Sequence, residues 1–161
     1  MIPDKGFKHA VAGVDWGFAN PGVIEVGGID TDGKMMLVEE AYSSGLRIGE
    51  WIEIAKQLRD RWDIKRFYCD PSEPDYIRAF NEAGLKAEAA NNSVNIGIQA
   101  VKARLAGNEP TLTVFNGVVH FADECEQYVW ATNQHGIKDA PVKAKDHTMD
   151  AVRYLIMGID Y

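Results

Sequence analysis

Three short apolar segments open the chain, and turn-forming residues separate them. The first is "HAVAGVD" at 9–15, which runs into the turn formers of "WGFANPG". The next two, "VIEVGGI" and "KMMLVEEAY", flank "DTDG", a typical hairpin connection. Residues 9–42 are therefore predicted to form an antiparallel three-stranded meander.

The spacing of apolar residues then changes from that of strands to that of helices. From Ile48 to Trp62 these residues recur at helical spacing. "IKRFYCD" at 64–70 predicts a strand, and "PSEPDYIRAFNEAG" predicts a helix with Ser72 as its N-cap. "LKAEAA" and "VNIGIQAVKARLAG" repeat the unit as a weak strand and a helix. This alternation predicts parallel strands with helices on the sheet faces.

The last third of the chain is predicted to add a hairpin and two helices. "LTVFNGVVHF" indicates an extra β-hairpin around Asn116-Gly117, and "ADECEQYVWA" indicates a helix. A polar loop at 132–145 precedes a final helix that begins at Asp146. The predicted fold class is α/β: a mixed sheet, with the antiparallel meander followed by parallel strands, flanked by helices and carrying the hairpin. One domain is expected over 1–161.

Composition narrows the classes of function. The 161 residues are 46% hydrophobic, which suits one globular domain, and no apolar run is long enough for a membrane span or a secretory signal. Cys69 and Cys125 lack CxxC spacing, so neither a disulfide framework nor a zinc site is indicated. The net charge of −7 argues against a domain that grips nucleic acid with its whole surface, but it suits a local site for divalent cations. We expect a soluble, cytoplasmic protein.

Two aspartates stand where predicted strands end. Asp15 closes the first strand and Asp70 closes the fourth. In an open α/β sheet, the ends of adjacent strands converge on the place where ligands bind. An acid after a strand can also be merely the first residue of a loop, and that alternative stays open for each aspartate taken alone.

The start of the final helix carries two carboxylates and an imidazole on one face. Asp146 is placed to be the N-cap, with His147 beside it and Asp150 one turn further on. The simpler alternative is that Asp146 only caps the helix while His147 and Asp150 are solvated. Carboxylates without cysteines suit Mg²⁺ or Mn²⁺ rather than zinc, and two such ions can drive phosphodiester hydrolysis.

Four motifs resemble the nuclease domain of the large terminase subunit of tailed bacteriophages, which has a ribonuclease H-like fold. They are "GVDWG" at 13–17, "YCDPSEPDYI" at 68–77, "ECEQYVW" at 124–130 and "DHTMDAVRYL" at 146–155. The resemblance covers essentially the whole chain. It implies a Mg²⁺- or Mn²⁺-dependent endonuclease, with two ions, that cleaves viral double-stranded DNA during genome packaging.

The same resemblance implies roles for individual residues. Catalysis falls to Asp15, Asp70 and Asp150, and metal binding to these three with Asp146 and His147. The hairpin and the loop 132–145 would line the DNA groove, where Lys138, Lys143 and Lys145 could meet phosphates. A charged, solvated loop is the alternative. Glu39, Glu40, Glu124 and Glu126 could support the site, although surface or helix-start positions are the simpler expectation.

The resemblance also implies partners. The large subunit of this family has a packaging ATPase domain, yet GxxxxGK[ST] is absent here, so the chain is expected to be the nuclease part of a larger ATPase-nuclease polypeptide. Portal, small terminase subunit and double-stranded DNA are the implied partners, in the host cytoplasm during infection. No membrane is expected to be involved.

Other functions remain compatible with the sequence. A Holliday-junction resolvase or a ribonuclease H would use the same carboxylates on another substrate. A non-catalytic docking module of the same fold, or an actin-like nucleotide-binding domain, would not need them as ligands. The absence of glycine-rich phosphate-binding loops counts against nucleotide binding.

Overall fold

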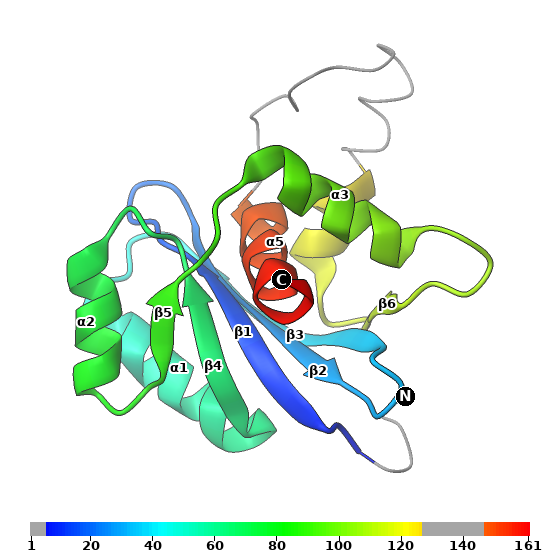
Figure 1. Cartoon of the computed structure of the whole chain (residues 1–161). Coiled ribbons are helices and arrows are strands. Elements are labelled where there is room, and N and C mark those ends of the chain that lie inside the picture. Colours follow the sequence, from blue (N-terminus) through cyan, green and yellow to red (C-terminus); the bar gives the residue numbers. More distant parts are fainter. Residues whose placement is uncertain (1–5, 127–146) are drawn as a thin grey trace.

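The computed structural model describes residues 6–126 and 147–161, and it consists of a six-stranded mixed sheet between two layers of helices (Figure 1). The strands are β1 (His9–Asp15), β2 (Gly22–Ile29), β3 (Met35–Ser43), β4 (Ile64–Cys69), β5 (Ala87–Ala89) and β6 (Leu112–Val114). The helices with defined bounds are α1 (Ile48–Trp62), α2 (Pro74–Glu82), α3 (Val94–Leu105) and α5 (His147–Asp160). None of the described helices is long and apolar enough to cross a bilayer.

The strand order is β5-β4-β1-β2-β3-β6. β1, β2 and β3 form an antiparallel meander, whereas β4 pairs in parallel with β1, and β5 in parallel with β4. The predicted mixed sheet is therefore confirmed. Because β1, β4 and β5 run in the same direction, their carboxyl ends lie along one edge of the sheet.

The predicted hairpin at 112–121 is wrong. Only β6 is a strand, and it pairs in parallel with β3, while residues 119–126 are helical. The Glu40 carboxylate accepts the amide N–H groups of His120 at 2.7 Å and Phe121 at 3.3 Å, which caps a helix rather than a second strand. Val118 and Phe121 are both buried, a spacing of three that a strand would place on opposite faces.

The predicted N-cap of α2 is also wrong. The helix begins at Pro74, and its N-cap residue is Glu73, which makes no side-chain capping bond. The Ser72 amide instead donates to Asp70 Oδ1 at 2.9 Å. Two local preferences explain the later start: Asp70 bonds to the backbone two residues on, and proline is favoured in the first turn of a helix.

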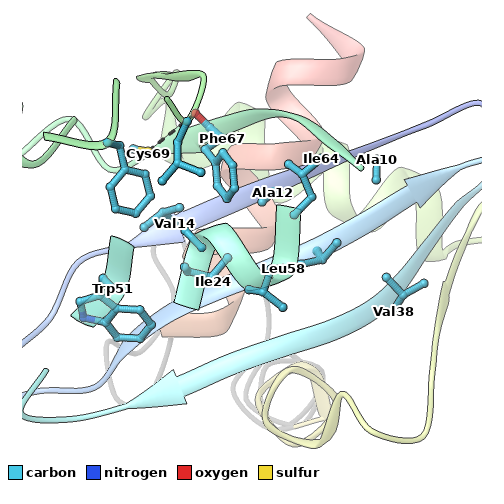
Figure 2. Packing of buried hydrophobic residues seen from close by; sticks show 14 residues of the cluster. Ala10, Ala12, Val14, Ile24, Val38, Trp51, Leu58, Ile64, Phe67 and Cys69 are labelled. Atoms are coloured by element: carbon cyan, nitrogen blue, oxygen red, sulfur yellow. Dashed lines mark hydrogen bonds between the residues drawn. The ribbon is translucent and has the colours of Figure 1, made fainter. Parts of the chain in front are cut away.

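One face of the sheet is covered by α1 and α2 and is packed with apolar side chains (Figure 2). Alternate residues of β1 and β2, among them Val14 and Ile24, point to this side. Trp51 and Leu58 of α1 meet them there, together with Phe67 of β4.

The other face is covered by α3 and α5 (Figure 1). α5 contributes Val152, Leu155 and Ile156 to a second apolar cluster. It also crosses β1 so closely that a Cβ added at Gly13 would lie 1.8 Å from the carbonyl oxygen of Ala151. Glycine at this position therefore lets the final helix rest directly on the first strand.

Candidate metal and nuclease site

Asp15 and Asp70 lie at the ends of two neighbouring parallel strands. The Asp70 amide donates to the carbonyl of Val14 at 2.8 Å, which continues the pairing of β1 and β4 to the last residue. The indole Nε1 of Trp16 donates to the Asp70 carbonyl at 2.9 Å. The residue after Asp15 thus ties the two strand ends together. Asp15 itself is buried, with 7% of its surface exposed.

The start of α5 lies against Asp15. His147 Nδ1 is 3.3 Å from Asp15 Oδ2, although 132 residues separate them in the chain. This contact depends on the close crossing of α5 over β1 at Gly13. The carboxylate of Asp15 in β1 and the imidazole of His147 in the first turn of α5 are therefore neighbours.

Asp150 is one helical turn beyond the start of α5 and is paired with Arg153. Arg153 Nη2 lies 3.0 Å from Asp150 Oδ1, and the arginine side chain is only 4% exposed. Its aliphatic stem fills the space over Gly97 of α3, where an added Cβ would lie 2.3 Å from Arg153 Cγ. The guanidinium carbon lies 5.0 Å from the centre of the Tyr154 ring. A buried cation therefore balances the charge of Asp150.

The Tyr154 phenol lies within electrostatic reach of all three aspartates. Burial raises the pKa of the Tyr154 phenol, and the negative charges of Asp70, Asp150 and Asp15 raise it further. Arg153 opposes this effect. Asp15, Asp70 and Asp150 come from β1, the turn after β4 and α5, and all three are close enough to act on the same hydroxyl group.

The donor set matches Mg²⁺ or Mn²⁺ by chemical type, since it offers carboxylate oxygens and one imidazole nitrogen. Within residues 6–126 and 147–161, however, no group of three or more His, Cys, Asp or Glu side chains is arranged to hold a metal ion. Asp15 and His147 form a close pair, whereas Asp150 is directed to Arg153. These residues therefore match a Mg²⁺ or Mn²⁺ site in the type of ligand that they offer and in their location.

Several predicted site residues fall outside the described part of the chain. Asp146 does so, as do the three lysines proposed to contact phosphates, which are Lys138, Lys143 and Lys145. Their roles stay predictions. The two amides that an Asp146 N-cap would bind, those of Thr148 and Met149, are bonded to the Glu124 carboxylate.

Sequence reasoning misses two contributions to this region. Gly13 belongs to the motif "GVDWG", but only the position of α5 explains why a side chain is excluded there. Arg153 follows Asp150 by three residues, yet neither its burial nor its ion pair is predicted from the sequence. An arginine three residues after an aspartate in an apolar helix is the signal that could have indicated the pair.

Comparison with solved structures finds the same fold in other proteins, although comparisons with protein-family models and with curated protein sequences gave no match. The large terminase from a thermophilic bacteriophage superposes with a TM-score of 0.84 at 23% identity, over 99% of this chain and 42% of the terminase. The chain thus spans about two fifths of that protein.

Isolated nuclease domains match over most of their length. The P22 large terminase nuclease domain gives a TM-score of 0.76 at 19% identity, covering 95% of this chain and 82% of that domain. The nuclease domain of the large terminase from bacteriophage SPP1, solved with bound Mn, gives 0.76 at 19% identity, covering 100% and 93%. The T. thermophilus RuvC in complex with a Holliday junction substrate gives 0.51 at 18% identity, over 94% of each chain. The chain therefore has a ribonuclease H-like fold, in the form that large-terminase nuclease domains share.

Proposed function

We propose that this chain is a divalent-metal-dependent endonuclease domain that cleaves double-stranded phage DNA during genome packaging. The observation that carries the proposal is the position of Asp15, which ends β1 beside Asp70 and lies 3.3 Å from His147 in the first turn of α5. The fold supports it, because the SPP1 nuclease domain of similar structure was solved with bound Mn.

Asp15, Asp70 and Asp150 would hold the metal, with His147 completing the ligand set. A divalent ion bound there would lower the pKa of a water molecule and stabilise the leaving oxygen in phosphodiester hydrolysis. The chain's own contribution is to hold these groups in place. Gly13 brings α5 onto β1, Trp16 joins the two strand ends, and Arg153 orients Asp150.

The same proposal includes a longer polypeptide and its partner proteins. Since the terminase of the thermophilic phage is more than twice as long as this chain, we infer that residues 1–161 are one nuclease domain of a longer polypeptide that also carries the packaging ATPase. Portal and small terminase subunit would be its partners in the host cytoplasm. Lys138, Lys143 and Lys145 would then contact DNA phosphates beside the acidic residues.

A plasmid-nicking assay in Mg²⁺ and in Mn²⁺ tests the activity. We expect the unmodified chain to nick supercoiled DNA, and Asp15→Asn, Asp70→Asn and Asp150→Asn each to reduce cutting to the level seen with EDTA. Asp32→Asn is the matched control, because Asp32 is exposed in the β2–β3 turn at the opposite end of the strands. Cutting by all three variants at the rate of the control would refute the assignment.

Junction resolution is a second candidate because RuvC shares the fold. Linear duplex, four-way junction and RNA-DNA hybrid can be compared at equal phosphate concentration. The packaging proposal predicts that duplex is cut at least as fast as the other two substrates. A strong preference for the junction, with symmetric cuts at the crossover, would favour the resolvase.

A further inference from the structure

Glu124 is a buried acid that bonds to the start of α5. Its carboxylate accepts the Thr148 amide at 3.0 and 3.3 Å and the Met149 amide at 3.2 Å. These are two of the donors that the first turn of a helix leaves without an intrahelical partner. Only 5% of the Glu124 surface is exposed. Its negative charge also faces the positive end of the helix dipole, which strengthens the contact.

The two residues that Glu124 binds lie between the two candidate ligands of α5. His147 precedes Thr148, and Asp150 follows Met149. A shift of these amides would move both side chains relative to Asp15, which contacts His147 at 3.3 Å. The contact therefore bears on the geometry of the site, although Glu124 belongs to a different helix.

The helix that carries Glu124 is itself fixed to the sheet. Glu40 of β3 accepts the amides of His120 and Phe121 at the start of the helical residues 119–126. The His120 ring stacks on Tyr42 of the same strand, with ring centroids 3.8 Å apart and an angle of 5° between the planes. A continuous set of contacts thus runs from β3 through residues 119–126 to the first turn of α5.

We propose that Glu124 is a positioning residue for the nuclease site: it fixes the first turn of α5, and through it the placement of His147 and Asp150 against Asp15. This inference rests on the proposed function for its catalytic consequence. Partners that orient metal ligands typically change metal affinity or activity by about 10–100-fold when they are removed. We expect an effect of that size on kcat or on the Mg²⁺ concentration needed for half-maximal cleavage.

Glu124→Ala and Glu124→Gln test the inference, with Glu126→Gln as the matched control. Glu126 is a glutamate two residues further along the same helix, and its side chain is exposed. In Glu124→Ala we expect amide hydrogen exchange at Thr148 and Met149 to accelerate at least tenfold. Glu124→Gln keeps an oxygen acceptor without the charge, so its exchange rates should lie between those of Glu124→Ala and the unmodified chain.

The kinetic pattern separates positioning from a loss of overall stability. Glu124 is buried, so its variants should lower kcat or raise the Mg²⁺ requirement while leaving KM for DNA unchanged. Val38→Ala, on the α1 face and 6% exposed, should lower Tm without this pattern. If Val38→Ala, at a comparable loss of Tm, shows the same fall in kcat, the positioning role is wrong.

The exchange measurement does not depend on activity, so two kinds of failure can be told apart. An unmodified chain that neither cuts DNA nor binds Mn²⁺ in calorimetry contradicts the proposed function. Exchange at Thr148 and Met149 that stays as slow in Glu124→Ala as in Glu126→Gln contradicts the role of Glu124, whether or not the chain cuts DNA.

Discussion

The two faces of the sheet bury different kinds of side chain. The face under α1 and α2 is apolar, with Val14, Ile24 and Phe67 packed against Trp51 and Leu58. The buried polar and charged residues of the described chain lie on the α5 side or within α5 and its neighbouring helix: Asp15, Glu25, Glu124, Thr148 and Arg153. Because buried charge is costly unless it is paired, we expect the α5 face to contribute less to the stability of the fold than the α1 face.

This difference indicates which face serves stability and which serves function. A sheet that needed only to fold could bury apolar residues on both sides. Successive side chains of β1 face opposite sides of the sheet, so Val14 points to the apolar cluster and Asp15 points to α5. Substitutions on the two faces should therefore separate loss of stability from loss of cleavage.

The largest expected effect is that of Gly13→Ala. A methyl group at this position would meet backbone atoms, the Ala151 carbonyl oxygen at 1.8 Å and its carbon at 2.8 Å, so no side-chain rotation can relieve the clash. We expect α5 to be displaced, cleavage to fall to background, and the free energy of unfolding to drop by more than the roughly 1–3 kcal/mol typical of overpacking. Denaturant unfolding and the nicking assay measure the two effects.

Gly49→Ala provides the matched control for that substitution. Gly49 lies in α1, and an added Cβ there would meet nothing within 4 Å. Because alanine is a better helix former than glycine, this change should stabilise the protein slightly and leave cleavage unaltered. A Gly13→Ala protein as stable and active as Gly49→Ala would show that α5 does not rest on β1.

A cavity on the apolar face should weaken the fold and spare the chemistry. Leu58 is 3% exposed and belongs to the cluster between α1 and the sheet. We expect Leu58→Ala to cost about 2–5 kcal/mol of unfolding free energy. At a temperature where the variant remains folded, its kcat should equal that of the unmodified chain. A loss of kcat in fully folded Leu58→Ala would mean that the two faces are coupled.

Local patterns are sufficient to predict most of the fold. The meander and α1 follow from apolar spacing within a few residues, and both match the structure. The predicted hairpin at 112–121 is wrong because Asn116-Gly117 is a local signal, whereas the helix there is capped by Glu40, which lies 80 residues from His120. A pattern read along the chain does not include a partner so distant.

The contacts of the candidate site likewise fall into those that the sequence predicts and those that it does not. The adjacency of Asp15 and Asp70 can be predicted, because the ends of neighbouring parallel strands meet at one edge. The contact of Glu124 with the first turn of α5 cannot, since it spans 24 residues and leaves no periodic signal. The roles of Asp146 and of the lysines at 138, 143 and 145 stay predictions, because these residues lie outside the described ranges.

The mildest expected effect comes from Glu25, whose side chain points to the α5 face. Glu25 is fully buried and lies opposite Glu40 in the pairing of β2 with β3. Burial raises the pKa of Glu25 well above its ordinary value of 4.5, and the neighbouring carboxylates of Glu40 and Glu124 raise it further. Between pH 4.5 and this raised pKa, the folded chain therefore keeps a proton on Glu25 that the unfolded chain releases.

This proton makes stability depend on pH with a definite sign. Above pH 4.5 and below the raised pKa of folded Glu25, the folded state binds more protons than the unfolded state, so the free energy of unfolding falls as pH rises. This loss of stability ends where the pH passes the raised pKa of folded Glu25. Glu25→Gln should remove this pH dependence, leaving the variant more stable than the unmodified chain at pH 8 and nearly equal to it at pH 4.

The control is Glu82→Gln, at an exposed glutamate near the end of α2, which should leave the pH dependence of the unfolding free energy intact. If urea unfolding at several pH values gives parallel curves for Glu25→Gln and the unmodified chain, then Glu25 is ionised in the folded protein, and the α5 face holds one more negative charge than proposed.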